Sequence, residues 1–539
     1  MNEPSYAVTD LWELIDTGLE NGGHLLAAGE MSVIRAVRTL SLPATEAYSR
    51  LTMRVPQPFR DSEFSAEIVT EWLESGLIDR LVPWRWRAEA CIVAELREAC
   101  ASLGLPAGGK RDDLLARLAD RRGWSDVRWF RLLHLDLIRR LERLTFLDLY
   151  RDRSQWVLER MGRRRWPEFT PVVGGLFRDR SSFLAWERCV EQRKEWTAET
   201  CFSALEAGNF GPEGGLHLRE RLIQRVCELA ENEESEQGLA WLERLPVDTS
   251  IRRSRWLERH QRPREALAVL RHGRATVSDP SERLALSRSG KRLAKTCGEG
   301  WAPDVPLASA IKRDVTLEWV GVSGGRPVYG EGVPVEEAVA RMFRDAGRTV
   351  LRAEGALWTT VFALLFSEAY FLPIPGMLPV RCLTGPLDVG TPAFATRRRA
   401  DVERIGAEIL GGGGPEKLRK SLERFRGVSL AGVSGAWDEE ALVGVVESIG
   451  PKGCWAILSE ILERGWPAAR GLPDLLVLNG PDVRLPRVFP SSVQGLLLIE
   501  VKGPTDAMRD DQAVWLDRLV KVKVPVNVWW VRAVSTENR

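Results

Sequence analysis

Histidine is scarce in this chain of 539 residues: there are five, and none lies beyond residue 272. A metal site or a general base in the rest of the chain must therefore rely on other side chains, and carboxylates are the usual oxygen ligands of hard cations. The eight cysteines include no CxxC pair, so the sequence excludes a zinc finger built on that spacing. Scattered cysteines of this kind predict free thiols in a reducing compartment.

Long apolar runs and an excess of one charge are also missing. The N-terminus has no charged-then-apolar leader, and no apolar stretch appears long enough to cross a bilayer, so we expect a cytoplasmic protein with no membrane partner. The formal net charge is +1, which means that any nucleic-acid surface must be local. The length predicts about three to four domains.

The first three hundred residues have the periodicity of helices. Segments 66–81 and 128–150 repeat apolar residues at three- and four-residue spacing, with charges on the opposite face. Residues 219–290 give shorter helices that resemble a degenerate tetratricopeptide-like array. Strand signals begin near residue 316, where 318–332 predicts a short hairpin or a loop with a Gly-Gly turn and 335–346 predicts a helix.

Residues 92–119 read as two helices joined by a Gly-Leu-Pro connection, IVAELREACASLGLPAGGKRDDLLARLA. This pattern resembles the SAP motif, a small module that docks on DNA, although an ordinary helical hairpin has the same outline. Charge favours the DNA interpretation, because residues 80–165 hold 20 Lys and Arg against 12 Asp and Glu, a surplus of eight. The candidate DNA-binding residues here are Lys110, Arg111, Arg121 and Arg122.

The chemistry is expected in the stretch GLLLIEVKGP, residues 495–504. Side chains alternate along a strand, so Glu500 and Lys502 share a face. Upstream, RGLPDLLVLNG places Asp474 at the start of another aliphatic strand, and an amphipathic helix and a last strand follow. Neighbouring strands would bring Asp474 and Glu500 together, and two close carboxylates call for a divalent cation. Lys502 could then polarise a metal-bound water, and the carbonyl of Val501 could add a ligand.

The pattern PD…ExK is the signature of the PD-(D/E)xK nuclease core, and EVKGPTDAMRDDQAVWL resembles its VRR-NUC type. The segments LRAEGALWTTVFALLFSEAYF, GPLDVGTPAFATRRRADVERI and ARGLPDLLVL follow the order found in Fanconi-associated nucleases. The chain is similar to a bacterial member of that family, since it lacks the cysteines of the ubiquitin-binding zinc finger of animal members. We therefore expect no ubiquitin binding through a zinc finger, and the sequence identifies no protein partner.

The resemblance implies roles for individual residues. Asp474 and Glu500 would ligate the metal, joined by Glu354 from a helix, and Lys502 would be the catalytic lysine. The insert at 479–494 departs from the family pattern. Gln512 and Asp506 would be polar residues beside the metal site. Arg397 and Arg398 would be a basic pair that contacts the DNA backbone.

Four domains are predicted: a helical domain at 1–79, a SAP-like DNA-binding region at 80–170, a helical-repeat region with linker at 171–315, and a nuclease domain at 316–539. The expected fold is thus multidomain, largely α-helical over the N-terminal two-thirds, with a C-terminal α/β PD-(D/E)xK nuclease core built on a mixed sheet.

The resemblance implies a Mg²⁺- or Mn²⁺-dependent nuclease that cuts 5′-flap and branched DNA, trims 5′→3′ and serves interstrand crosslink repair. Such a protein would be nucleoid-associated in a bacterium. Two alternatives stay open on the sequence: a Holliday-junction or restriction-type nuclease on the same core, and a protein that binds DNA structures without cutting them.

Overall fold

The computed structural model describes residues 5–54, 58–119, 121–147, 151–172, 174, 177, 179–191, 195–208, 214–323, 326–434, 437–478 and 495–535. The chain gathers into two compact units. The N-terminal unit comprises Met1–Arg163 and Pro171–Glu187, and the C-terminal unit comprises Arg164–Thr170 and Arg188–Arg539. The four predicted domains remain a prediction; the contacts place the first two largely in one unit and the last two in the other. The insert at 479–494 lies outside the described residues.

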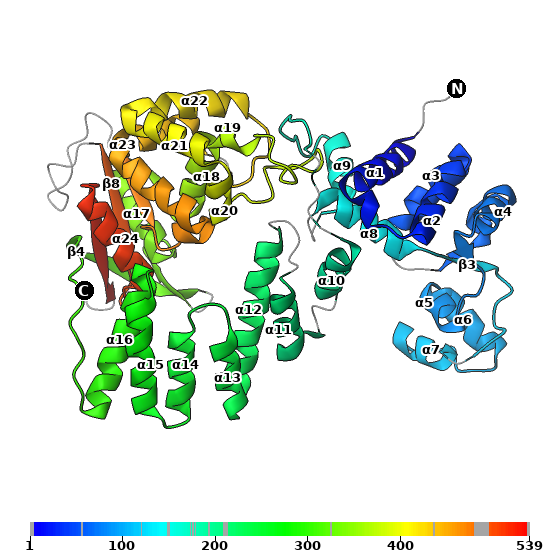
Figure 1. Cartoon of the computed structure of the whole chain (residues 1–539), viewed down its shortest axis with the longest axis horizontal. Coiled ribbons are helices and arrows are strands. Elements are labelled where there is room, and N and C mark those ends of the chain that lie inside the picture. Colours follow the sequence, from blue (N-terminus) through cyan, green and yellow to red (C-terminus); the bar gives the residue numbers. More distant parts are fainter. Residues whose placement is uncertain are drawn as a thin grey trace. The chain divides into compact units, whose positions relative to one another are not determined.

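The N-terminal unit is mainly helical (Figure 1). A small antiparallel sheet of order β1-β3-β2 ties its segments together, with Phe130 opposite Phe59 and Leu132 opposite Ile78. The sequence did not predict these strands, because each is only two to four residues long. The elements are α1 Tyr6–Gly22, α2 Ala28–Thr39, α3 Leu42–Thr52, β1 Phe59–Arg60, α4 Ala66–Glu74, β2 Ile78–Asp79, α5 Trp84–Glu89, α6 Val93–Ser102, α7 Arg111–Leu118, β3 Trp129–Leu132, α8 Leu135–Phe146, α9 Ser154–Arg160 and α10 Arg180–Glu191, which ends beyond the unit boundary.

The hairpin of α6 and α7 is the segment expected from the motif at 92–119. Each helix begins with a carboxylate that accepts a backbone N–H three residues earlier: Glu95 from Ile92 at 2.9 Å, and Asp113 from Lys110 at 2.9 Å. Buried leucines of both helices share one small core with Val82 and Trp129. The predicted helical hairpin is confirmed.

The C-terminal unit begins with six helices that pack one on the next. Caps fix their ends: the Asp279 carboxylate, for example, accepts the N–H groups of Ser281 and Glu282 at the start of the last helix, where Pro280 occupies the first position. This helical array matches the predicted repeat region in outline. Its helices are α11 Ala198–Ala207, α12 Gly214–Asn232, α13 Glu236–Arg244, α14 Ser250–Arg259, α15 Pro263–Thr276 and α16 Pro280–Cys297.

A mixed six-stranded sheet of order β5-β4-β9-β8-β7-β6 follows the array. The helix α24, Asp510–Lys521, joins β8 to β9, which run parallel, while β7 and β8 are antiparallel. The predicted hairpin at 318–332 and helix at 335–346 are present as β4, β5 and α17. The bounds are β4 Ile311–Ser323, β5 Arg326–Tyr329, α17 Val335–Asp345, β6 Thr349–Arg352, β7 Leu475–Leu478, β8 Leu496–Lys502 and β9 Val526–Ser535.

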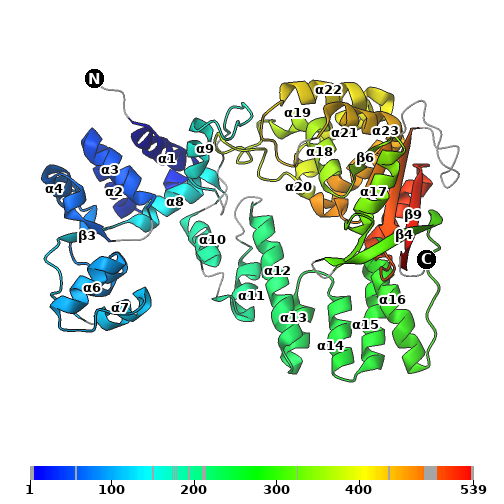
Figure 2. The same ribbon diagram turned by 180° about the vertical axis from the view of Figure 1, so that it is seen from behind.

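Two cores cover the two faces of this sheet. One face packs on α17, where Val339 and Phe343 meet Ile499 and Trp529. The other packs on α24 and on a group of helices inserted between β6 and β7. The two opposite views of the chain show these covering elements (Figures 1 and 2). Because both faces are covered, β8 is buried along its whole length, as its continuous apolar sequence predicts. The inserted helices are α18 Ala356–Leu365, α19 Ser367–Tyr370, α20 Pro392–Arg397, α21 Arg399–Glu408, α22 Gly414–Arg424 and α23 Glu439–Arg464.

The helix α23 differs from the expectation that no segment could cross a membrane, because its 26 residues are long and apolar enough by length and composition alone. Its most apolar window is 56% buried inside the protein, and Leu442, Ile457 and Leu458 belong to the core. Gly450, at φ +71°, and Pro451 kink it midway. We therefore interpret α23 as a core helix.

Candidate active site

The site lies where β8 ends, and the strand presents two charged side chains there on the same face. The Lys502 ammonium is 2.8 Å from Oε1 of Glu500, as the alternation along the strand predicts. The two residues are only 5% and 1% exposed, which excludes a solvated surface ion pair at a strand tip. A charge pair removed from water requires further polar partners.

Gln512, in the first turn of α24, supplies those partners. Its Nε2 donates to Oε1 of Glu500 at 2.5 Å, and its Oε1 accepts from the Lys502 ammonium at 2.8 Å. The same Oε1 accepts the N–H of Arg509 at 3.1 Å, which caps the helix. Gln512 therefore fixes the start of α24 against the end of β8 and links the carboxylate to the lysine.

Asp474 immediately precedes β7, and the strand register places it opposite Glu500, because Leu475 pairs with Ile499. Its Oδ2 accepts the N–H of Val501 at 2.7 Å. The structure thus brings the two predicted metal carboxylates to one end of the sheet. The carbonyl of Val501 stays a predicted ligand.

Glu354 also reaches this end of the sheet, but not from a helix as expected. The N–H of Ala353 donates to the Asp474 carbonyl at 2.8 Å, which sets Glu354 beside Asp474. Glu354 occupies the turn before α18, which starts at Ala356, and it is exposed. The turn, held by the β6–β7 pairing, positions this carboxylate.

A further acid was missed in the sequence: Glu336, in the first turn of α17. Its carboxylate is close enough to raise the pKa of Asp474. The only signal was the pair Glu336-Glu337 at a helix start, which is common because acids favour the helix dipole there. In the structure Glu337 is engaged by arginines, including Arg344 at 2.7 Å.

Burial and mutual repulsion shift both central carboxylates. Burial raises the pKa of Asp474 to about 6, helped by the charges of Glu354 and Glu336 and opposed by the Val501 N–H and Lys502. Burial also raises the pKa of Glu500 to about 8, with Asp474 adding to the rise and Lys502 opposing it. Such carboxylates favour a bound proton or a bound cation over free ionisation.

The donors fit a hard divalent cation. The candidate side-chain ligands are all carboxylates, and with the predicted carbonyl of Val501 they are the oxygen ligands that Mg²⁺ and Mn²⁺ take. Oε2 of Glu500 is buried and has no hydrogen-bond partner in the part of the chain that the structure describes, so it is available to a cation. Among the described residues no three Asp, Glu, His or Cys side chains already converge into a metal cage.

This repulsion predicts that Asp474→Asn stabilises the metal-free protein at high pH. The folded-state pKa lies above the unfolded value, so ionising Asp474 destabilises the fold as pH rises from about 4 to beyond 6. We expect the free energy of unfolding of Asp474→Asn to exceed that of the wild type by about 1–3 kcal/mol at pH 8.5 and to equal it at pH 4. Denaturant titrations with a chelator present measure both values. Adding Mn²⁺ should raise the melting temperature of the wild type more than that of the variant. Equal pH profiles, or the same gain in Asp345→Asn on the exposed end of α17, would contradict the account.

One predicted DNA contact is not supported. Arg398 is 2% exposed, its guanidinium is 2.7 Å from Oδ2 of the buried Asp388, and it lies 4.5 Å from the ring centre of Phe394. A guanidinium inside the helical insert cannot reach a DNA backbone, so Arg398 is a structural residue. Arg397 is 36% exposed and lies 3.5 Å from the same carboxylate; its DNA contact stays a prediction.

The buried pair predicts a large loss of stability when one partner is removed. Asp388→Ala leaves the Arg398 charge without its counter-ion, and we expect unfolding to become easier by about 3–5 kcal/mol in denaturant titrations. The double variant Asp388→Leu/Arg398→Leu should be less unstable than Asp388→Ala. Arg419→Ala, which removes an exposed pair with Glu447, serves as the control at about 0–1 kcal/mol. A loss no larger than the control's would refute the structural role.

The remaining basic candidates lie in the N-terminal unit and are exposed: Lys110, Arg111, Arg121 and Arg122. Lys110 and Arg111 open α7, where the Arg111 guanidinium also donates to the Glu89 carbonyl at 2.6 Å. Their exposure suits phosphate contact, and their DNA binding stays a prediction.

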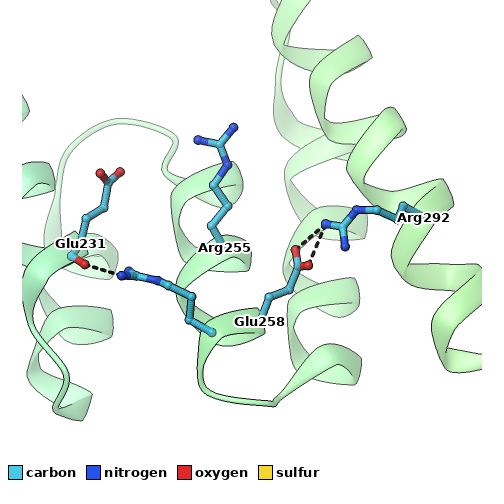
Figure 3. Close-up of a pocket in the computed structure, with 5 residues that line it drawn as sticks. Glu231, Arg255, Glu258 and Arg292 are labelled. Carbon is cyan, nitrogen blue, oxygen red and sulfur yellow. Dashed lines mark hydrogen bonds and ion pairs between the residues drawn. The ribbon is translucent and has the colours of Figure 1, made fainter.

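A separate pocket of about 400 Å³ lies in the helical array. Figure 3 shows Glu258 turned toward Arg292, 2.7 Å away, and Arg255 standing between Glu231 and Glu258. The acids here are already engaged, since Glu231 also pairs with Arg252. No residue of the β8 site lines this pocket, so it is not the candidate active site.

Comparison with known proteins agrees with this geometry. The VRR-NUC domain model matches residues 415–533, and the SAP domain model matches residues 92–121. A Fanconi-associated nuclease 1 homolog of Arabidopsis thaliana is 27% identical over 456 residues, 74% of this chain and 49% of the relative. A Pseudomonas aeruginosa homolog is 26% identical over 414 residues, 75% of this chain and 70% of the relative. The chain thus spans about half the length of the plant relative.

Solved structures give the same fold. A crystal structure of paFAN1 bound to DNA with a 2-nt 5′ flap and a gap superposes with a TM-score of 0.81 at 24% identity, covering 99% of both chains. A second paFAN1 complex, with a 1-nt 5′ flap, gives a TM-score of 0.79 at 23% identity over 99% of this chain and 100% of the other. The expected fold class, with its helical N-terminal part and its mixed-sheet nuclease core, is confirmed. The C-terminal part of this chain is thus a VRR-NUC domain, and the chain resembles the Fanconi-associated nucleases in sequence and in fold.

Proposed function

We propose that this protein is a divalent-metal-dependent DNA nuclease that cuts 5′-flap and other branched DNA and trims 5′→3′, in a role such as interstrand crosslink repair. The observation that carries the proposal is the buried group of Glu500, Lys502 and Gln512 at the end of β8 with the half-buried Asp474 beside it, and the raised pKa values of the two carboxylates. A structural ion pair alone does not account for a second carboxylate, Asp474, opposite Glu500 on the neighbouring strand.

The substrate class rests on the relatives. The matched proteins are named Fanconi-associated nucleases, and the matched paFAN1 structures hold 5′-flap DNA. The SAP match at 92–121 lies within the basic stretch at 80–165 and supplies a second DNA-binding element. Exposed arginines and lysines neutralise phosphates wherever they contact the backbone, which fits recognition of DNA by shape.

The site residues divide the chemical work. Asp474 and Glu500 would hold a Mg²⁺ or Mn²⁺ ion, joined by Glu354 or Glu336. When bound, such an ion lowers the pKa of water and offsets charge on the phosphate oxygens. Lys502 places a positive charge beside Glu500 and orients the attacking water, and Gln512 keeps that ammonium in place. Burial excludes bulk water, which strengthens each of these interactions.

End-labelled substrates test the proposal. Purified protein with Mn²⁺ is incubated with 5′-flap, 3′-flap, four-way-junction and plain duplex DNA at the same concentration. We expect cutting of the 5′-flap substrate in preference to the others. Symmetric cuts on the four-way junction would favour a junction-resolving nuclease, and retarded but intact flap DNA would favour a binding protein without catalysis.

A further inference from the structure

The first turn of α24 is the place where three parts of the C-terminal unit meet. Its third residue, Gln512, holds the carboxylate and the lysine at the end of β8. Its second residue, Asp511, packs on the loop that leads to Asp474: an added Cβ on Gly471, at φ +84°, would lie 2.9 Å from the Asp511 carboxyl carbon. Its first residue, Asp510, is bound by the helical array.

Arg288, on the last helix of the array, makes the contact with Asp510. Its Nη1 donates to Oδ1 of Asp510 at 3.1 Å, and its Nη2 lies 2.8 Å from Oδ2 of the same carboxylate. Two parallel contacts of this kind fix the orientation of both planar groups, which a single contact does not. Figure 1 shows α16 next to α24, and the two helices pack on each other.

This pair differs from an ordinary surface ion pair in its geometry and its place. Exposed pairs contribute little to stability unless their geometry is bidentate. The Arg288 side chain is 65% exposed, but that of Asp510 is only 21% exposed. A second contact lies further along the same helix, where the N–H of Ala308, in the linker after α16, donates to Asp517 at 2.7 Å. The array segment and its linker thus hold α24 at its start and again near its end.

The start of α24 is mechanically connected to the reacting groups. Oε1 of Gln512 accepts both the backbone N–H of Arg509, which begins the helix, and the ammonium of Lys502. A shift of the first turn therefore moves the amide that holds the lysine. Misplacing a catalytic group by about 1 Å lowers a rate by as much as about 100-fold.

We propose, on the basis of the function proposed above, that Arg288 is a positioning residue of the nuclease: its bidentate contact with Asp510 holds the first turn of α24 in place. Gln512 then keeps the Lys502 ammonium beside Glu500. The last helix of the array is thereby a working part of the active site, and Arg288 acts on the reaction only through α24.

Hydrogen exchange of the metal-free full chain tests the contact without catalysis. Arg288→Ala should speed amide exchange in residues 509–513 about fivefold, because the first turn opens more easily once its partner is gone. Arg292→Ala is the matched control, since Arg292 lies one turn later on α16, is 59% exposed and pairs with Glu258 inside the array. That control should leave residues 509–513 unchanged. Unchanged exchange there in Arg288→Ala would overturn the inference.

Single-turnover cleavage of 5′-flap DNA, at saturating enzyme and Mn²⁺, measures the consequence for the reaction. We expect Arg288→Ala to cut about 10-fold more slowly, as when a group that supports an active-site residue is removed. Fluorescence anisotropy with the same DNA in the absence of metal should give nearly the wild-type affinity. Arg292→Ala should match the wild type in both. A rate within threefold of the wild type, or a loss that lies in DNA affinity, would contradict the proposal.

Double-variant cycles identify the connection. In the Asp510→Ala background, and again in the Gln512→Ala background, adding Arg288→Ala should slow cleavage little further, because the groups through which Arg288 acts are already gone. A full additional loss in either background would show that Arg288 acts elsewhere. Wild-type protein that leaves flap DNA intact would defeat the proposed function, while hydrogen exchange would still report on the contact. A wild type that cuts, with Arg288→Ala at the same rate, would defeat the inference alone.

Discussion

Glu500→Gln is expected to slow the cutting of 5′-flap DNA by about a thousandfold or more, because a catalytic metal supplies several kcal/mol of transition-state stabilisation. Glutamine has nearly the same shape, so the packing at the end of β8 survives. Glutamine lacks the negative charge, and Oε2 of Glu500 is a buried acceptor with no hydrogen-bond partner among the described residues, which we assign to the cation. The loss should therefore appear in turnover, with the fold intact.

Single-turnover cleavage at saturating enzyme and Mn²⁺ measures this effect, with circular dichroism confirming the fold. Glu318→Gln is the matched control, because it makes the same chemical change on an exposed position of β4 in the same sheet. We expect that control to cut at the wild-type rate. A Glu500→Gln enzyme within tenfold of the wild type would show that Glu500 is not a metal ligand.

Lys502→Met should reduce cleavage by about 10²–10⁴-fold, the usual contribution of a positioned group in proton transfer. The ammonium lies 2.8 Å from both Glu500 and Gln512, and methionine keeps the apolar stem while removing the charge. Arginine should not rescue activity, since its planar guanidinium is larger and donates in a different geometry.

Two measurements separate catalysis from binding in this variant. Fluorescence anisotropy with labelled flap DNA in the absence of metal should give nearly the wild-type affinity, and single-turnover cleavage should show the full loss. Lys312→Met, at an exposed position of β4, should change neither quantity much. Weakened DNA binding that accounts for the whole loss of Lys502→Met would place the lysine in DNA recognition instead.

The centre of the site could be predicted from the sequence because its geometry is local. Glu500 and Lys502 share a face by strand alternation alone. Gln512 is expected beside them only from the family resemblance, and the structure places it at the end of the same strand. Asp474 required one more assumption, that its strand neighbours β8, and the antiparallel pairing of Leu475 with Ile499 bears this out.

The outer part of the site could not be predicted, because it depends on contacts between distant segments. Glu336 lies close enough to raise the pKa of Asp474 only because β4 pairs with β9 more than two hundred residues later and brings the hairpin and α17 with it. The position of Glu354, in a turn before α18, depends on the pairing of β6 with β7, and the sequence alone does not predict that pairing. The DNA contact predicted for Arg398 is wrong because a pair of basic residues in a sequence does not reveal which of the two is buried. In the structure the Arg398 guanidinium pairs with the buried carboxylate of Asp388.

The short strands of the N-terminal unit show the same limit. Segments of two to four residues are too short to show a hydrophobic periodicity. β1 and β2 form because each pairs with one edge of β3. The helices of that unit were predictable because amphipathic spacing extends over several turns.

The most direct test of the central claim is to locate the ion. Crystals of the full chain soaked in Mn²⁺ should give an anomalous-scattering peak at the end of β8, about 2 Å from Oε2 of Glu500 and from an Asp474 oxygen. A well-occupied Mn²⁺ site elsewhere, with these two carboxylates still bound only to protein groups, would contradict the account.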